Sequence, residues 1–113
     1  MKKIEAIIKP SKLSNVKDAL HEIGLSGMTV SDVKGFGRQR GQDGGLNSTH
    51  DYDDEFRVKI KIELIIEDKM VEKALESIKN AAYSGKIGDG KIFIYTIDQV
   101  IRIRTGEKDS DAV

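Results

Sequence analysis

The strongest indication of the fold is FRVKIKIELII, residues 56–66. Its even-numbered positions are all apolar, and its odd-numbered positions from 57 to 63 are all charged. A period of two is typical of a β-strand with one face in the core and one face outside it. A slip of one residue would bury four charges, so the pattern predicts both the strand and its register.

Three further segments are predicted as strands: residues 2–9, 28–36 and 91–97. Two segments instead repeat apolar residues at steps of three and four, which is the period of an amphipathic helix. The first helix is expected between Ser11, as its N-cap, and Gly24, and the second between Asp68, also as a cap, and Gly85. The helix faces comprise Leu13, Val16, Leu20 and Ile23 in the first, and Val71, Ala74, Leu75, Ile78 and Ala82 in the second.

The order of elements is strand, helix, strand, strand, helix, strand. This order predicts an α+β fold, the ferredoxin-like βαββαβ sandwich, with both helices on one face of the sheet. Residues 1–113 are expected to form a single domain. The other sheet face needs a cover, and the simplest cover is a second copy of the chain, because so small a domain gains buried area by oligomerising.

The amino-acid composition argues against several classes of function. Lysine plus arginine and aspartate plus glutamate number 19 each, so the formal net charge is zero and nothing indicates nucleic acid or an anionic membrane as a partner. No apolar run is long enough to span a bilayer, and the N-terminus lacks a signal-peptide core. The absence of cysteine excludes disulfides and thiolate metal sites. We therefore expect a cytoplasmic protein.

Residues 37–55 do not fit a compact domain. About twenty residues separate the second and third predicted strands, whereas hairpin loops usually take two to five. The segment is rich in glycine and acidic residues, so we expect a flexible, functional loop. The polar tail of residues 105–113 is expected to be frayed.

Two glycine-rich turns stand at strand ends, residues 35–39 and 85–91. Each exposes backbone N–H groups next to a cation, an arrangement that can hold phosphate oxygens. An isolated turn of this kind is more often only a tight turn, but Arg102 and Arg104 add two cations that an extended strand would present on one side. The second turn is not a P-loop, since Ile92 replaces the required serine or threonine and a strand follows it.

Catalysis has little support. His21 falls on the polar side of the first helix, and His50 lies in an acidic run that is more often solvated than metal-binding. The phenylalanines Phe36, Phe56 and Phe93 are spaced as strand residues and are expected in the core, not as base-stacking platforms.

Three blocks of residues make the sequence recognisable. They are MKKIEAIIKP at 1–10, GMTV at 27–30 with VKGFGRQ at 33–39, and SGKIGDGKIFI at 84–94 with IRIRTGE at 101–107. In this order and at this spacing the chain resembles the PII signal-transduction family over nearly its whole length. The resemblance implies a homotrimer of ferredoxin-like subunits that binds ATP or ADP in the clefts between neighbours.

Carried over by position, the resemblance also implies the site residues. For nucleotide they are Thr29, Gly35, Gly37, Arg38, Ile65, Gly88, Asp89, Gly90, Lys91, Arg102 and Arg104. For 2-oxoglutarate they are Gln39, Lys59, Ile87 and Gly88, with Gln39 also holding the magnesium that accompanies ATP. Lys59 would pair with the far carboxylate of 2-oxoglutarate, so its loss is expected to spare ADP binding.

Departures from the family pattern bear on partners. The resemblance implies that the loop at 37–55, the family's T-loop, binds an ammonium transporter or enzymes of nitrogen metabolism. Leu46 to Asp51 replace the usual loop motif, while Tyr52 falls at the modifiable tyrosine. Arg57 and Val58 beside Lys59 also differ from the usual residues, which leaves open a sensor of ATP and ADP alone. The sequence is also compatible with a nitrogenase-regulating branch, a purely structural trimer, and an acyl phosphatase or weak nucleotidase on the same sandwich.

Overall fold

The computed structural model describes residues 1–36 and 56–113. Its strands are β1 (Lys2–Ile8), β2 (Thr29–Phe36), β3 (Phe56–Ile66) and β4 (Lys91–Thr96). Its helices are α1 (Leu13–Glu22) and α2 (Val71–Ala82), with short 3-10 turns at Pro10–Lys12, Asp68–Met70 and Asp109–Asp111. The element order is the one predicted from the sequence.

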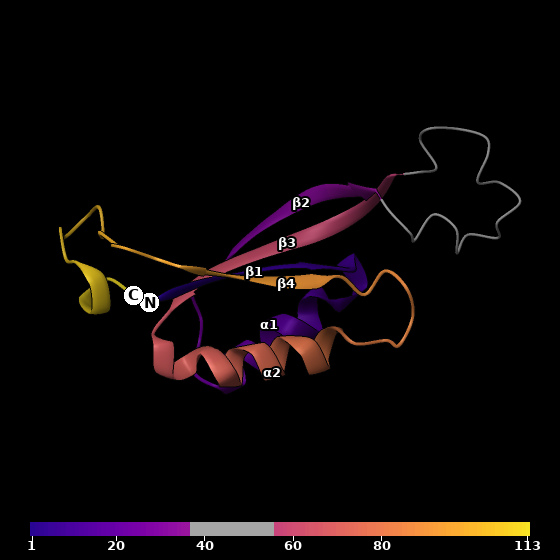
Figure 1. The fold of residues 1–113 in the computed structure, drawn as a ribbon, viewed down its shortest axis with the longest axis horizontal. Helices are drawn as coiled ribbons and strands as arrows, with labels where there is room; N and C mark the ends of the chain where they lie inside the picture. Colours follow the sequence, from indigo (N-terminus) through magenta and orange to yellow (C-terminus); the bar gives the residue numbers. More distant parts are fainter. Residues whose placement is uncertain (37–55) are drawn as a thin grey trace, which may run out of the picture.

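The four strands form one sheet in the order β2-β3-β1-β4, and every neighbouring pair is antiparallel. Both helices lie against the same face of this sheet, as Figure 1 shows, and no described element covers the opposite face. This is the predicted ferredoxin-like arrangement. We call the uncovered side the open face.

The core lies between the helices and the sheet. It contains the even-numbered residues of β3 from Ile60 to Ile66, which are at most 6% exposed, and Ile4, Ala6 and Ile8 of β1. Val16 and Leu20 of α1 pack on them with Ala74, Ile78 and Ala82 of α2. The odd-numbered residues of β3 lie on the open face, so the register expected from the period of two is confirmed.

The helix ends are only partly as predicted. Gly24 ends the first helix with a φ of +90°, and its N–H donates to the His21 carbonyl at 3.0 Å. The predicted caps Ser11 and Asp68 are wrong, because a 3-10 turn precedes each helix and neither helix has a side-chain cap bond. Asp68 instead pairs with the N-terminal ammonium of Met1 at 2.9 Å.

The prediction that the phenylalanines lie in the core is wrong. Phe36 is 56% exposed, Phe56 49% and Phe93 43%. Phe36 and Phe56 face each other across β2 and β3 with ring centroids 5.5 Å apart. Phe36 and Phe56 are exposed because the end of the β2–β3 pair at which they lie extends beyond the helices. Phe93 is exposed because it lies on the open face, opposite Glu5.

The C-terminal segment is also more ordered than expected. It folds back on itself, with Ile101 bridging to Lys108 and the Arg102 N–H donating to the Glu107 carbonyl at 2.8 Å. The Asp109 carboxylate accepts a hydrogen bond from the Val100 N–H at 3.1 Å. These bonds replace both the extended strand expected at 101–104 and the frayed tail.

Candidate functional site

The loop at residues 83–90, which joins α2 to β4, is built around one carboxylate. Asp89 accepts the backbone N–H groups of Ser84 at 2.8 Å and Gly85 at 2.9 Å, and also the Ser84 hydroxyl. The Lys9 ammonium, from the end of β1, lies 3.2 Å from the same carboxylate and donates to the Ser84 hydroxyl at 3.1 Å. These contacts close the loop and attach it to β1.

The charge of Asp89 is maintained by these contacts. Burial by itself would raise the pKa of the carboxyl group, but the hydrogen bonds from Ser84, Lys9 and Gly85 outweigh burial and hold the pKa well below its usual range. Asp89 is therefore an anion at every physiological pH. Its side chain organises the loop and does not line the larger cavity described below.

Gly90 lets the loop approach β1 more closely than any other residue could. Its φ is +105°, and a Cβ at this position would lie 1.7 Å from the carbonyl oxygen of Ile7. The next residue, Lys91, pairs with Ile7 in the sheet. Glycine at 90 therefore places the start of β4, and with it the Lys91 side chain, directly beside the open face.

Lys59 is the one buried charged side chain among the described residues, with 8% of its surface exposed. It lies on β3, and its ammonium donates to the Gly88 carbonyl at 2.8 Å. Burial lowers the pKa of Lys59, and the nearby charges of Lys9 and Arg57 lower it further, while Asp89 opposes them. A buried cation in such surroundings is suited to bind an anion.

A cavity of about 690 Å³ opens on this end of the open face. Its size is in the range of small-ligand sites. Three cationic side chains line it, Arg57, Lys59 and Lys91, together with the glycine-rich loop. The remaining lining residues are Ile7, Gly35, Phe36, Ile87, Gly88, Gly90 and Phe93. Because no carboxylate of residues 1–36 or 56–113 lines it, this cavity can hold phosphate or carboxylate groups.

Six of the predicted site residues meet at this cavity. They are Gly35, Lys59, Ile87, Gly88, Gly90 and Lys91. A Cβ at Gly35 would lie 3.4 Å from the Lys59 side chain, which is ordinary van der Waals contact, so space alone does not require glycine there. Gly37, Arg38, Gln39 and Tyr52 lie outside the described residues.

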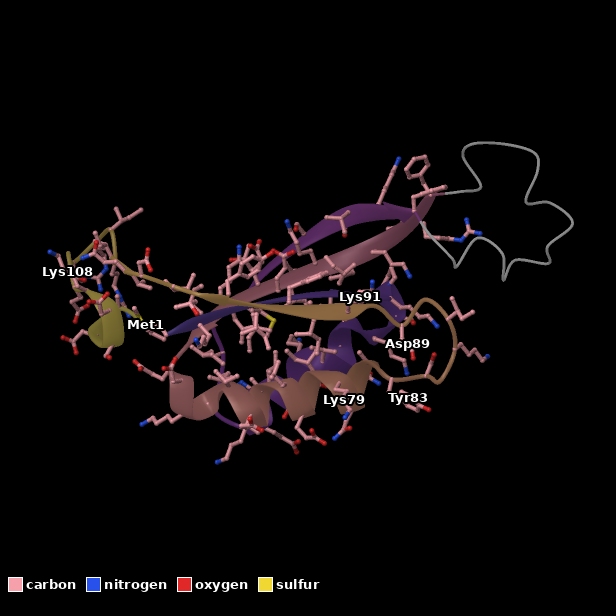
Figure 2. All side chains as sticks on the ribbon, in the orientation of Figure 1. Met1, Lys79, Tyr83, Asp89, Lys91 and Lys108 are labelled. Atoms are coloured by element: carbon pink, nitrogen blue, oxygen red, sulfur yellow. The ribbon has the colours of Figure 1, made fainter. Side chains whose placement is uncertain are left out.

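Asp89 lies in the same loop without lining the cavity, and the remaining predicted residues lie at the opposite end of the sheet. Thr29 pairs with Glu63 and Ile65 pairs with Lys3, close to the N-terminus. Arg102 and Arg104 belong to the C-terminal segment, which Figure 1 shows at the end where both termini lie, far from the loop at 83–90. Figure 2 shows the same separation between Lys108, which neighbours Arg102 through the Ile101 bridge, and Asp89 with Lys91. One chain therefore does not bring the two halves of the predicted site together.

The arginines of the C-terminal segment are accessible. Arg102 makes a 3.6 Å ion pair with Glu107, and both side chains are more than 40% exposed. Ile103, between the two arginines, is 99% exposed.

The sequence pattern did not identify several residues of the cavity: Ile7, Arg57, Phe93 and the supporting Lys9. The signal for Arg57 was present, because it shares its strand face with Lys59. Ile7 and Phe93 join the cavity only through the pairing of β1 with β3 and β4, which the sequence does not show.

Within residues 1–36 and 56–113, no group of three or more histidine, cysteine, aspartate or glutamate side chains could hold a metal ion. No helix in the same part of the chain is long and apolar enough to cross a membrane.

Comparison with known proteins agrees with this architecture. The family model described as "Nitrogen regulatory protein P-II" matches residues 1–107. Proteins of that name from Rhodospirillum rubrum and Azospirillum brasilense are 60% and 56% identical over 113 residues, which is the whole of each chain. The one from Bradyrhizobium diazoefficiens is 55% identical over the same length.

A solved structure extends the agreement to three dimensions. The crystal structure of Arabidopsis thaliana PII bound to citrate superposes with a TM-score of 0.82 at 39% identity, covering 99% of this chain and 91% of that one. The relatives are named as regulatory proteins, and the family consists of signalling proteins and not enzymes, so an acyl phosphatase or a nucleotidase is set aside. On the evidence of sequence and fold, this chain belongs to the nitrogen regulatory protein P-II family.

Proposed function

We propose that this protein reports cellular nitrogen status by binding ATP or ADP together with 2-oxoglutarate in clefts between the subunits of a homotrimer. The bound state is passed to an ammonium transporter or to enzymes of nitrogen assimilation through residues 37–55, in the cytoplasm. The observation that carries the proposal is the cavity, which gathers three cations and a glycine-rich loop at one end of the open face.

The separation of the site residues supports a site that is shared between copies of the chain. Lys91 and the loop lie at one end of the folded molecule, and the C-terminal segment with Arg102 and Arg104 lies at the other end. A head-to-tail contact, in which the C-terminal turn of one copy meets the cavity of the next, would bring both sets to one nucleotide. Such contacts form a ring when the rotation between copies closes, and the ring we propose is a trimer. Thr29 and Ile65 would reach the nucleotide from the same end as the arginines.

The residues present fit a nucleotide and an organic acid better than a resident metal. Lys59 and Lys91 provide charge, and the loop provides backbone N–H groups for phosphate oxygens. Magnesium would be held by oxygen atoms of ATP, of 2-oxoglutarate and of the Gln39 amide, since none of the described carboxylates lines the cavity. The binding of citrate by the Arabidopsis relative supports a site for small carboxylates in this fold.

The free-energy cost of ordering residues 37–55 limits how much of this segment the ligands can control. Fixing one residue's backbone costs roughly 1–2 kcal/mol, so two small ligands do not supply enough free energy to order all of residues 37–55. Ligands would instead act on the base of this segment, at Gln39. A coupling of about 1–3 kcal/mol between the effectors and the partner is enough for regulation.

The first test measures nucleotide binding by calorimetry. Lys91→Ala and Arg102→Ala should each weaken ADP and ATP about ten- to a hundredfold, because each removes one charge-assisted phosphate contact. Lys73→Ala, at an exposed position of α2, is the charge-matched control and should bind as the wild type does. Unchanged affinity in both test variants would refute the phosphate assignment.

Mixing the two variants tests the shared cleft directly. If Lys91 and Arg102 come from different copies, then trimers assembled from both variants should regain wild-type affinity in about one cleft in four. Light scattering on the same samples gives the oligomeric state. A monomer at micromolar concentration, or no recovery in the mixture, would contradict an intersubunit site.

The second test concerns the effector. 2-Oxoglutarate should bind measurably only when magnesium and ATP are present, because Lys59 alone is one cation against a dianion that water solvates well. By thermodynamic linkage, 2-oxoglutarate must then raise the affinity for ATP by the same factor by which ATP raises the affinity for 2-oxoglutarate. Calorimetry that finds no 2-oxoglutarate binding with magnesium and ATP would favour the sensor of ATP and ADP alone.

A further inference from the structure

The ammonium of Lys59 joins two parts of the site that are far apart in sequence. It extends from β3 and donates to the carbonyl of Gly88, 29 positions along the chain, at 2.8 Å. Gly88 lies in the loop at 83–90, which is also held by the contacts of its next residue, Asp89, with Ser84 and Lys9. The Lys59 bond is thus a second contact, beside the Lys9–Asp89 ion pair, that fixes the loop to the sheet.

Because the Lys59 side chain is buried, its bond to the Gly88 carbonyl matters for the stability of the charged ammonium. A buried ammonium needs acceptors, and Gly88 provides the one hydrogen-bond acceptor that Lys59 has among the described residues. Two of its three N–H donors remain for an incoming ligand. Gly88 also has a φ of +103°, so its carbonyl is oriented by a backbone conformation that other residues rarely adopt.

We propose that Lys59 is a positioning residue for the phosphate-binding loop, in addition to any contact with the effector. By holding the Gly88 carbonyl it keeps the backbone N–H groups of the loop at the cavity before any ligand binds. The inference rests on the proposed nucleotide site. It also changes an expectation from the sequence, because a residue that served 2-oxoglutarate alone would not affect ADP.

This role provides a physical link between the two ligands. A carboxylate that binds the free N–H donors of Lys59 would stabilise the charged ammonium and hold it in place beside the Gly88 carbonyl. The loop would then be better ordered for nucleotide phosphates. Lys59 would therefore carry part of the coupling between 2-oxoglutarate and ATP, and each ligand would raise the affinity for the other.

The test uses Lys59→Met, which keeps a long apolar stem and removes the ammonium. In the absence of 2-oxoglutarate, this variant should bind ADP about tenfold more weakly, and the amides of residues 84–90 should exchange hydrogen several-fold faster. Amides of β1 and β3 should remain protected, and the thermal midpoint should stay the same or rise, because a buried charge has been removed. Lys61→Met, two residues along the same strand face, is the matched control and should change neither ADP affinity nor loop exchange.

Lys59→Arg provides the rescue. A guanidinium can donate to the Gly88 carbonyl, so loop exchange and ADP affinity should return at least partly toward wild type. If Lys59→Met leaves both ADP binding and loop exchange unchanged, Lys59 has no positioning role. If the wild type binds no nucleotide, the proposed function fails, but exchange in the ligand-free protein still decides whether Lys59 holds the loop.

Discussion

Gly90→Ala should destabilise this protein more than any other single glycine replacement in the described residues. An alanine Cβ would lie 1.7 Å from the Ile7 carbonyl oxygen and 2.8 Å from the Ile7 carbonyl carbon. These are backbone atoms of the central strand β1, which pairs with both β3 and β4 and has little freedom to move. The φ of +105° adds strain of its own for a residue with a side chain.

The expected loss is about 3 kcal/mol or more in the free energy of unfolding, since strained backbone costs about 1–3 kcal/mol and the clash adds to it. Chemical denaturation measures this loss. Two other glycines separate the causes: Gly24 has a φ of +90° with nothing within 4 Å, and Gly27 has neither a positive φ nor a close neighbour. Gly24→Ala should lose about 1 kcal/mol and Gly27→Ala close to nothing. Equal losses in all three variants would show that the approach of Gly90 to Ile7 is not the constraint.

The second large effect is expected from Asp89→Ala. This change removes the acceptor for two backbone N–H groups, the Ser84 hydroxyl and the Lys9 ammonium. Hydrogen bonds to a charged group contribute about 1.5–3 kcal/mol, and the partly exposed position reduces their sum, so we expect a loss of about 2–4 kcal/mol. Because the loop also carries Gly88 and leads directly into Lys91, nucleotide affinity should fall too. Asp98→Ala, an exposed aspartate without a hydrogen bond or ion pair in the described residues, is the control.

The pH dependence of this effect has a definite sign. The hydrogen bonds hold the pKa of Asp89 well below the ordinary carboxyl value, which is about 4 in an unfolded chain. A group with a lowered pKa in the folded state stabilises the protein fully above the unfolded pKa and loses that contribution as the pH falls toward the folded one. The difference in stability between wild type and Asp89→Ala should therefore be constant from about pH 6 to 8 and shrink only below about pH 4. A difference that grows on acidification would contradict this account of the loop.

How much the sequence could predict differs between the fold and the site. The period of two in residues 56–66 and the helical spacing on α1 and α2 were sufficient for the element order and the core face, because burial of apolar side chains acts locally on each element. The helix starts were wrong because the short 3-10 turns depend on how the chain leaves each strand. The predicted burial of the phenylalanines was wrong because residue type does not show where the helices stop covering the sheet.

The family, the buried face of residues 56–66 and the glycine-rich loop could all be identified from the sequence, since each of them is visible in the order and spacing of residue types along the chain. Which residues share a cavity depended instead on how the strands pair. The pairing of β1 with β3 and β4 brought Ile7 and Phe93 to Lys59, and the return of the chain after α2 placed the Gly88 carbonyl on the Lys59 ammonium. The same folding separated Arg102 from Lys91, which follow each other closely in the sequence, because the extended chain of β4 runs from one end of the sheet to the other.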